Sequence, residues 1–418
     1  MQERGRRSAR RRRRIGRALV LLAAWAALSG CLGPGAVRFT RMRYNEVVRE
    51  TNDQQLLMNL VRLRYADSPV FIDLPTIISQ FELAAGGSDP GPSGSQTNFG
   101  VAGGWARDTP TINYHPREGR EIAKALLTPL SADLFSVINA GASIEQLLLL
   151  TINDLNDVPN APRATTLTPT VSDDNAEFLR GIRLLEALRD REGTELAIGT
   201  TDLSDDMSDP IDKDAVDGGH LLDAATKGYA FRSQGNGRMA LVRRQKDLFL
   251  KIRAPFVNSH EMAEFARIFH LTPGLDRYRI RSELSDETSS GPPKPLDDHD
   301  RGTIYLNMRS VLQIMTFLSK GVCVPEEHVR SGVVPMTPGP DGRPFDWTRI
   351  TAGNFFIASQ KHRPKDAEVA VEYRGYWFYI APQDVRSRAI LSFLEVLFAL
   401  QESGERFAGP ALTLPLGG

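Results

Sequence analysis

The stretch VAVEYRGYWFYIAPQDVRSRAILSFLEVLFALQ, residues 369–401, carries the strongest local fold signals in the chain. Two runs of β-branched and aromatic residues, Val369–Tyr373 and Tyr376–Ile380, are separated by a turn that contains Gly375, a pattern that predicts a β-hairpin. A proline and an aspartate then precede a helix that is expected from about Val385 to Gln401. With the helix and strand patterns elsewhere, this stretch predicts an α+β fold of mixed helices and small antiparallel sheets, in two packed subdomains.

The helix expected at 385–401 is apolar on nearly every side. A helix of this kind is either central to a core or half-buried against a partner, because an exposed apolar face is unfavourable in water. Its apolar residues are Ile390, Leu391, Phe393, Leu394, Val396, Leu397, Phe398 and Leu400.

The hairpin before this helix is rich in aromatic residues: Tyr373, Tyr376, Trp377, Phe378 and Tyr379. Successive side chains of a strand point to opposite faces, so Trp377 and Tyr379 should share one face, and Tyr376 and Phe378 the other. Core packing is the commoner use of such residues. The alternative is a face that stacks against a sugar or a peptide, and these five residues are the candidate binding face.

The start of the chain has the pattern of an export signal. Residues 1–17 contain nine arginines and one glutamate, and an apolar run follows from Ala18 to Leu28. A charged start, a short apolar segment and small residues before a cleavage site predict a signal peptide over residues 1–30. The apolar run is shorter than the roughly 20 residues of a membrane-spanning helix. The arginines leave twin-arginine export open beside the general route.

The tetrapeptide Leu28-Ser29-Gly30-Cys31 resembles the bacterial lipobox. The resemblance implies transfer of diacylglycerol to the Cys31 sulfur, cleavage before Cys31 and acylation of the new amino terminus. Several acyl chains together anchor a protein stably. Residue 32 is leucine rather than aspartate, which indicates the periplasmic face of the outer membrane. The alternative is an ordinary signal peptide followed by an unrelated cysteine.

Removal of residues 1–30 changes the charge balance. It takes nine of the 51 basic residues and one of the 51 acidic residues, which leaves 42 and 50 and a net charge of about −8. Such a chain lacks the basic face that nucleic acids bind, so no nucleic-acid partner is expected. Cys323 is the one cysteine besides Cys31, and its apolar surroundings predict a buried residue.

Composition predicts the following organisation. A loop-forming segment rich in Pro, Thr and Asn separates two α+β domains, and acidic or Pro/Gly-rich segments interrupt the second domain. The predicted parts are a signal peptide at 1–30, an acylated tether at 31–41, an N-terminal domain at 42–156, a linker at 157–172, and a C-terminal domain at 173–418 with loop insertions near 201–217, 283–302 and 333–346.

Residues 44–65 are expected to form two helices. The first covers Tyr44–Glu50. Thr51 and Gln54 then fit a capping box, in which each side chain bonds the backbone N–H of the other residue, so a second helix should begin there.

Arg64 projects into the leucine-rich side of the second helix. It either binds an anion or packs its stem while its guanidinium pairs with Asp67 or Asp73. The second interpretation is preferred, because long charged side chains commonly pack in this way.

No catalytic or metal-binding motif is present. The seven histidines form no H-x-H or H-E-x-x-H pattern, and G-x-S-x-G and S-x-x-K are absent. The acidic segment near 201–217 does not match a calcium loop. The sequence therefore predicts no cofactor, no metal and no catalytic residue.

Three blocks resemble a set of uncharacterised bacterial lipoproteins: YNEVVRETNDQQLLMNLVRLRYADSPVFIDL, then TPTINYHP followed by LLTPL, and YRGYWFYIAPQD. The resemblance covers most of the chain after the signal peptide, except for the acidic and proline-rich insertions. It implies a lipoprotein and supplies no activity, cofactor or site residue.

The function predicted from these observations is a non-enzymatic outer-membrane lipoprotein that binds a protein partner or another envelope component. Two alternatives stay open. One is a carrier of an apolar ligand, with a pocket beneath the last helix. The other is an envelope hydrolase whose site is assembled from distant residues.

Overall fold

The computed structural model describes twelve segments of the chain: residues 32–85, 97–101, 104–116, 120–131, 134–135, 143–166, 169–171, 175–206, 209–282, 301–339, 341–351 and 353–402. The predicted signal peptide and the lipobox, with Cys31, lie outside the described residues, as do residues 283–300 of one predicted insertion. The chain divides into two compact units. One runs to Leu56 and includes 72–116, and the other contains 57–71 and the chain from 117 onward.

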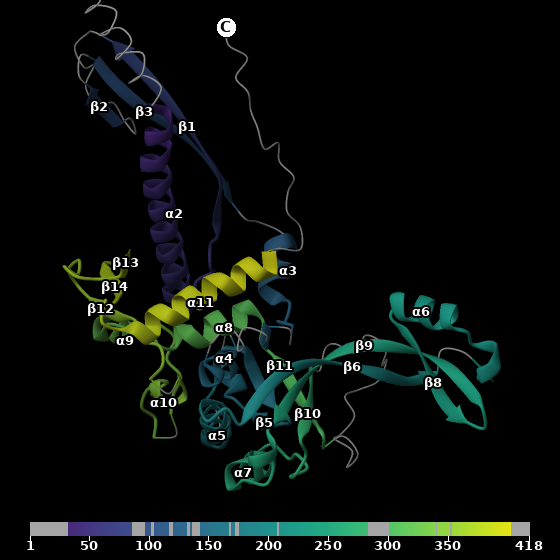
Figure 1. The fold of residues 1–418 in the computed structure, drawn as a ribbon. Helices are drawn as coiled ribbons and strands as arrows, with labels where there is room; N and C mark the ends of the chain where they lie inside the picture. Colours follow the sequence, from purple (N-terminus) through teal and green to yellow (C-terminus); the bar gives the residue numbers. More distant parts are fainter. Residues whose placement is uncertain are drawn as a thin grey trace, which may run out of the picture. The chain divides into compact units, whose positions relative to one another are not determined.

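The first unit combines a helix and a three-stranded sheet. Helix α2, Leu32–Arg64, contributes its residues up to Leu56. Strands β1 (Ile72–Ala85), β2 (Thr97–Val101) and β3 (Gly104–Pro116) pair in the antiparallel order β1-β3-β2 (Figure 1). This sheet is one of the small antiparallel sheets that belong to the predicted fold class.

Helix α2 is continuous, so the prediction of two helices and a capping box is wrong. Thr51 lies in the middle of the helix, and its hydroxyl donates to the carbonyl oxygens of Val47 and Val48, each at 2.9 Å. A threonine can bond back to the preceding turn in this way without ending a helix. Residues 32–41, predicted as a tether, are also part of α2.

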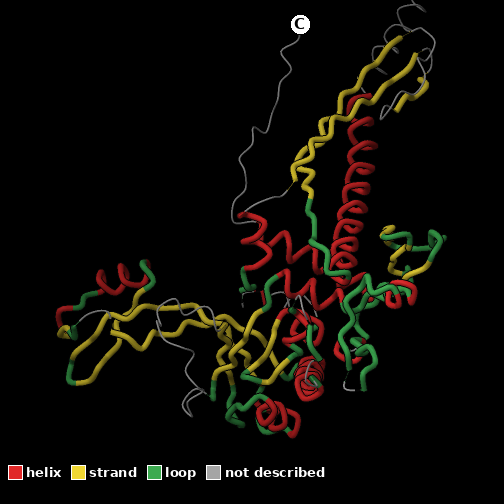
Figure 2. Tube along the Cα trace, turned by 180° about the vertical axis from the view of Figure 1, so that it is seen from behind, coloured by secondary structure: helices red, strands yellow, loops and turns green. Residues whose placement is uncertain are grey.

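The second unit contains the largest sheet, in the order β5-β4-β11-β10-β9-β6, with β7 and β8 also paired to β9. Strands β10 and β11 are parallel and the other pairs are antiparallel. The strands are β4 (Ile152–Leu155), β5 (Val158–Pro159), β6 (Thr194–Asp206), β7 (Ile211–Asp212), β8 (Tyr229–Gly235), β9 (Arg238–Ile252), β10 (Arg277–Ser282) and β11 (Thr303–Met308). Figure 2 shows the long strands β6 and β9 side by side.

Three helices cover one face of this sheet: α4 (Ile144–Thr151), α5 (Ala176–Asp190) and α7 (His260–Ile268). Gly181 of α5 permits close packing on α7, because a Cβ there would collide with the ring of Phe269. Ser143 and Ser259 cap α4 and α7 by accepting the backbone N–H three residues later. The Ser259 cap and a helix at this position agree with the sequence pattern.

The remaining helices are short except for the last. They are α3 (Arg120–Leu127), α6 (Gly218–Thr226), α8 (Val311–Ser319), α9 (Glu326–Arg330), α10 (Thr348–Thr351) and α11 (Val385–Glu402), with one-turn 3₁₀ helices at 162–165, 213–215 and 254–256. Among the described residues, no helix is both long and apolar enough to cross a membrane.

A second small sheet confirms the hairpin predicted at residues 369–380. Strands β13 (Val369–Tyr373) and β14 (Tyr376–Ile380) pair with Tyr373 opposite Tyr376, and β12 (Ala358–Gln360) joins the other edge of β14. Arg374 and Gly375 both have positive φ, as a two-residue hairpin turn requires. The helix predicted at 385–401 is α11. The predicted α+β class is confirmed.

Two loop predictions are corrected. Residues 157–166 of the predicted linker lie inside the second unit, where the side chain of Asn160 is fully buried. Its amide donates to the carbonyl oxygens of Leu149 and Ile152, each at 2.9 Å. The acidic segment 201–217 is not all loop, because β6 continues to Asp206 and β7 follows. The boundary between units thus differs from the predicted boundary at 157–172.

Arg309 is the largest fully buried side chain in the described structure. Its guanidinium donates to the carbonyl oxygens of Leu149 (2.8 Å), Leu150 (3.2 Å) and Asn160, and to Asn153 Oδ1 (3.1 Å). The group also lies 4.5 Å from the centroid of the Phe317 ring. Burial lowers the pKa of Arg309 to about 9, which leaves it protonated at neutral pH. It therefore joins the end of α4 to the turn at Asn160.

Replacement of this guanidinium should destabilise the second unit strongly. We expect Arg309→Met to lower the free energy of unfolding by about 3 kcal/mol or more, because buried carbonyl oxygens lose their donors. Urea denaturation measures the change. Arg183→Met is the matched control, since its exposed ion pair should be worth less than about 1 kcal/mol. Equal effects of the two substitutions would contradict this account.

Candidate functional site

The five aromatic residues predicted as a binding face lie on the small sheet next to α9 (Figure 1). The two faces of β14 differ in burial. Phe378 and Ile380 are buried, whereas Trp377 and Tyr379 are half-exposed. The expected division of the aromatic side chains between two faces is therefore confirmed, and each face has its own surroundings.

The inner face packs around Tyr65, the residue that follows α2. The rings of His328, Tyr373 and Phe378 contact the Tyr65 ring edge-on, with centroids 5.6, 5.3 and 6.0 Å away. The Tyr65 hydroxyl is 2.6 Å from Nδ1 of His328. Burial raises the pKa of Tyr65 to about 12, although the nearby Arg64 and Arg374 charges oppose the shift. Tyr65 thus holds α9 and the hairpin to the end of α2.

Two carboxylates surround this aromatic cluster. Asp67 accepts hydrogen bonds from the Tyr373 hydroxyl and from Arg374 Nη2, the latter at 2.9 Å. The Tyr373 bond is the main reason that the pKa of Asp67 is lowered. Glu327 accepts from the Tyr376 hydroxyl at 2.7 Å, which lowers the pKa of that carboxyl as well. Tyr373 and Tyr376 thus each donate a hydrogen bond to a carboxylate beside the cluster.

The outer face leaves Trp377 and Tyr379 accessible. Tyr379 lies opposite Ala358 on one neighbouring strand and opposite Ala370 on the other, so no large side chain covers it across the sheet. The guanidinium of Arg363 lies 5.3 Å from the Trp377 ring centroid. Flat aromatic surfaces of this kind can stack against planar or apolar groups. The candidate binding face therefore narrows to Trp377 and Tyr379, and binding there stays a prediction.

Arg64 has no carboxylate partner among the described side chains, so the pairing expected with Asp67 is wrong. Its Nη1 donates to the carbonyl oxygen of Pro335 at 3.0 Å, and its Nη2 lies 3.4 Å from Met336 Sδ. Asp67 pairs with Arg374 instead, and the Asp73 side chain lies outside the described part. The sequence could not show this, because Pro335 and Met336 are more than 270 residues further along the chain.

Lys320 was missed by the sequence analysis. It follows the last residue of α8 and is buried, and its ammonium lies 5.6 Å from the centroid of the Trp347 ring. Burial and then the charge of Arg64 lower its pKa to about 8. A lysine directly after a helix and next to a glycine resembles an ordinary surface cap, so no local pattern marks it.

Cys323 is exposed, and the prediction of a buried thiol is wrong. Val322 forms a bridge with Ile357 and is buried, so the next side chain points outward. The backbone N–H of Cys323 donates to the Ile357 carbonyl oxygen at 2.8 Å. The apolar neighbours in sequence were therefore a poor guide to the burial of this residue.

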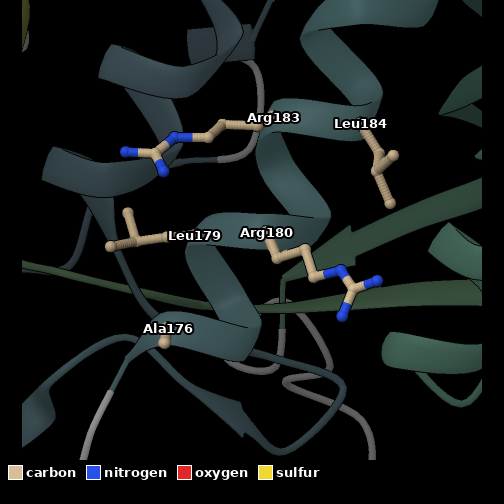
Figure 3. A pocket seen from close by; sticks show the side chains of 5 residues that line it. All are labelled: Ala176, Leu179, Arg180, Arg183 and Leu184. Carbon is tan, nitrogen blue, oxygen red and sulfur yellow. The ribbon is translucent and has the colours of Figure 1, made fainter.

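The exposed side of α5 forms an open depression of about 360 Å³. Figure 3 shows its lining, in which Arg183 and Leu179 point to one side and Arg180 and Leu184 to the other. Both arginines are already neutralised, Arg183 by Glu145 at 3.0 Å and Arg180 by Glu264. Side chains that diverge and carry no spare charge do not form a binding site.

An apolar cavity of about 40 Å³ lies between the large sheet and α4, α5 and α7. Ligand pockets for small molecules usually measure roughly 300–1,000 Å³. The cavity is thus far too small for a carried ligand, and it does not involve α11. In the part of the chain that the structure describes, no three His, Cys, Asp or Glu side chains come together to hold a metal ion.

Comparison with known proteins gives no relative: no protein-family model, no curated protein and no solved structure matches the chain. The resemblance to uncharacterised bacterial lipoproteins therefore stays a prediction.

The Tyr65 hydroxyl should make stability fall at alkaline pH. A tyrosine that ionises near pH 10 when unfolded but near 12 when folded contributes stability below pH 10, which is lost as pH rises towards 12. We expect Tyr65→Phe to cost about 1–2 kcal/mol at pH 8 and to flatten the fall between pH 10 and 12. Urea denaturation at several pH values measures both, with Tyr379→Phe as control. The idea fails if Tyr65→Phe follows the pH profile of the parent protein.

Proposed function

We propose that this protein is an outer-membrane lipoprotein, anchored through acyl chains on Cys31, that binds an envelope protein through the exposed side of α11. The anchor is supported by the arginine-rich start, the short apolar run and the lipobox-like Leu28-Ser29-Gly30-Cys31. The partner surface is supported by the distribution of burial around α11, and this single observation carries the proposal.

Helix α11 is buried on one side only. Its buried apolar residues are Ile390, Leu391, Leu394, Leu397 and Phe398. Residues 385, 389, 392 and 396 recur at the spacing of one helix face and are all exposed. Val385 is 67% exposed and Val396 is 48% exposed, with Ala389 and Ser392 between them.

The exposed stripe Val385–Ala389–Ser392–Val396 contains no charged residue. Soluble proteins seldom leave contiguous apolar surface in water unless a partner covers it. Two valines separated by small residues allow the close approach of another helix or of a sheet face. The sequence left open whether α11 is central to a core or half-buried, and the burial pattern favours the half-buried alternative.

The alternative of an apolar-ligand carrier has less support. The apolar cavity in the second unit measures only about 40 Å³, and no residue of α11 lines it. A partner protein needs no cavity, since complementary surfaces suffice.

The anchor is tested by Cys31→Ser in the native host. We expect the parent protein to fractionate with membranes and to incorporate a labelled fatty acid, because acyl chains supply the attachment. The substituted protein should lose the label and leave the membrane fraction. Equal membrane association of both forms would rule out the anchor.

The partner surface is tested by a double substitution, Val385→Lys with Val396→Lys. Both positions are exposed, so the free energy of unfolding should change by less than about 1 kcal/mol. The parent protein should capture a specific partner when it is crosslinked in the native envelope and then affinity-purified. The double variant should no longer capture that partner. Ile198→Lys on β6 is the matched control, since Ile198 is 72% exposed but lies on the large sheet. Unchanged crosslinks in the double variant would refute the assignment to α11.

A further inference from the structure

Two buried cations of the second unit interact electrostatically. Arg64 is at the end of α2 and is 7% exposed, and Lys320 directly follows α8 and is 8% exposed. The charge of Arg64 contributes to the lowered pKa of Lys320, after the larger effect of burial. Two like charges near one another in a low-dielectric setting repel, and neither lies where water can fully solvate it.

No carboxylate among the described side chains compensates these charges. The contacts of Arg64 are a carbonyl oxygen and a thioether sulfur, and its Nε is buried without a hydrogen-bond partner. Within the described structure, the Lys320 ammonium makes no hydrogen bond or ion pair, and its contact is with the face of Trp347. Among the described side chains, the pair therefore has a spare donor on Arg64 and no carboxylate that compensates its charges.

A role in capping the C-terminus of α8 does not explain the position of the Lys320 ammonium. A cation near a helix C-terminus can bond the last carbonyl oxygens. Here those oxygens already accept backbone N–H groups: Phe317 from Lys320, Leu318 from Gly321, and Ser319 from Val322. The lysine ammonium is therefore not needed to complete the end of this helix.

Arg309 is a useful comparison, because it is a buried cation whose guanidinium has hydrogen-bond acceptors within the chain. Its guanidinium donates to three carbonyl oxygens and one amide oxygen, so burial is compensated by hydrogen bonds. Arg64 and Lys320 are also buried, though less completely, and they lack such a set of acceptors among the described residues. A bound ligand with hydrogen-bond acceptors would supply the missing set.

Another unpartnered donor belongs to the segment packed on the end of α8. Nδ2 of Asn354 is buried without a hydrogen-bond partner. The next residue, Phe355, lies so close to Gly321 that a Cβ on Gly321 would collide with the Phe355 carbonyl oxygen. Gly321 follows Lys320, so this segment passes close to the backbone of Lys320.

We propose that Arg64 and Lys320 bind a phosphate group. A phosphate monoester or inorganic phosphate carries a charge of about −1.5 to −2 at neutral pH, which matches two cations better than a carboxylate or a chloride ion does. Its oxygens accept several hydrogen bonds at once, and arginine suits them by geometry. The phosphate is either free or the headgroup of a phosphatidic acid. This site is separate from the partner surface on α11.

The test measures thermal unfolding of the full chain in detergent at pH 7 and constant ionic strength. The additions are sodium chloride, inorganic phosphate and a soluble short-chain phosphatidic acid. We expect at least one of the two phosphate compounds to raise the Tm in a saturable way that chloride does not match. A response to both compounds, or to one, supports the site and identifies the source of the phosphate.

The variant Lys320→Met removes one cation and keeps the apolar stem. In chloride its Tm should equal or exceed that of the parent protein, because an uncompensated buried charge is lost, and this result also shows that the variant folds. Its apparent Kd for the phosphate compound should rise at least tenfold. Lys361→Met, at an exposed lysine, is the control and should keep the parental response. The proposal is wrong if neither compound exceeds chloride, or if Lys320→Met responds like the parent protein.

Discussion

The core of the second unit depends on the hydrogen bonds that the guanidinium of Arg309 donates. This residue lies beyond the end of β11 and bonds the last carbonyl oxygens of α4 and the oxygen of Asn160, while its backbone N–H donates to Thr151 at 2.7 Å. Asn160 completes the arrangement by donating to the same end of α4. One side chain thus satisfies the polar groups that would otherwise stop a helix from ending inside the core.

The positively charged side chains of this chain have different kinds of partners. These differences distinguish cations with a structural role from those that could bind a ligand. Exposed arginines on α5 pair with carboxylates of neighbouring elements. Arg309 is buried and bonded to uncharged oxygens, and Arg374 joins the hairpin to Asp67. Among the described residues, Arg64 and Lys320 are buried without a carboxylate partner, and Arg64 Nε has no acceptor. A protein seldom keeps such a cost unless another molecule removes it, which is why this pair carries the phosphate proposal.

The sequence predicted those elements whose signals are local. The hairpin at 369–380 and helix α11 follow from strand alternation, a glycine turn and helix periodicity, which are properties of adjacent residues. The prediction of two helices in place of α2 was wrong, because a threonine such as Thr51 can either cap a helix or lie within one, and the neighbouring residues do not distinguish the two cases. The partners of Arg64, the role of Arg309 and the position of Lys320 depend on residues distant in the chain, so no local pattern contains them.

We propose that this chain lies at a membrane surface, where α11 meets a protein partner. Intact-mass analysis of the chain purified from its native envelope tests that claim most directly. We expect a chain that begins at Cys31 and carries the added mass of the diacylglycerol and amino-terminal acyl groups. A full-length chain recovered from the cytosol, with its arginine-rich start attached and an unmodified Cys31 thiol, would contradict it.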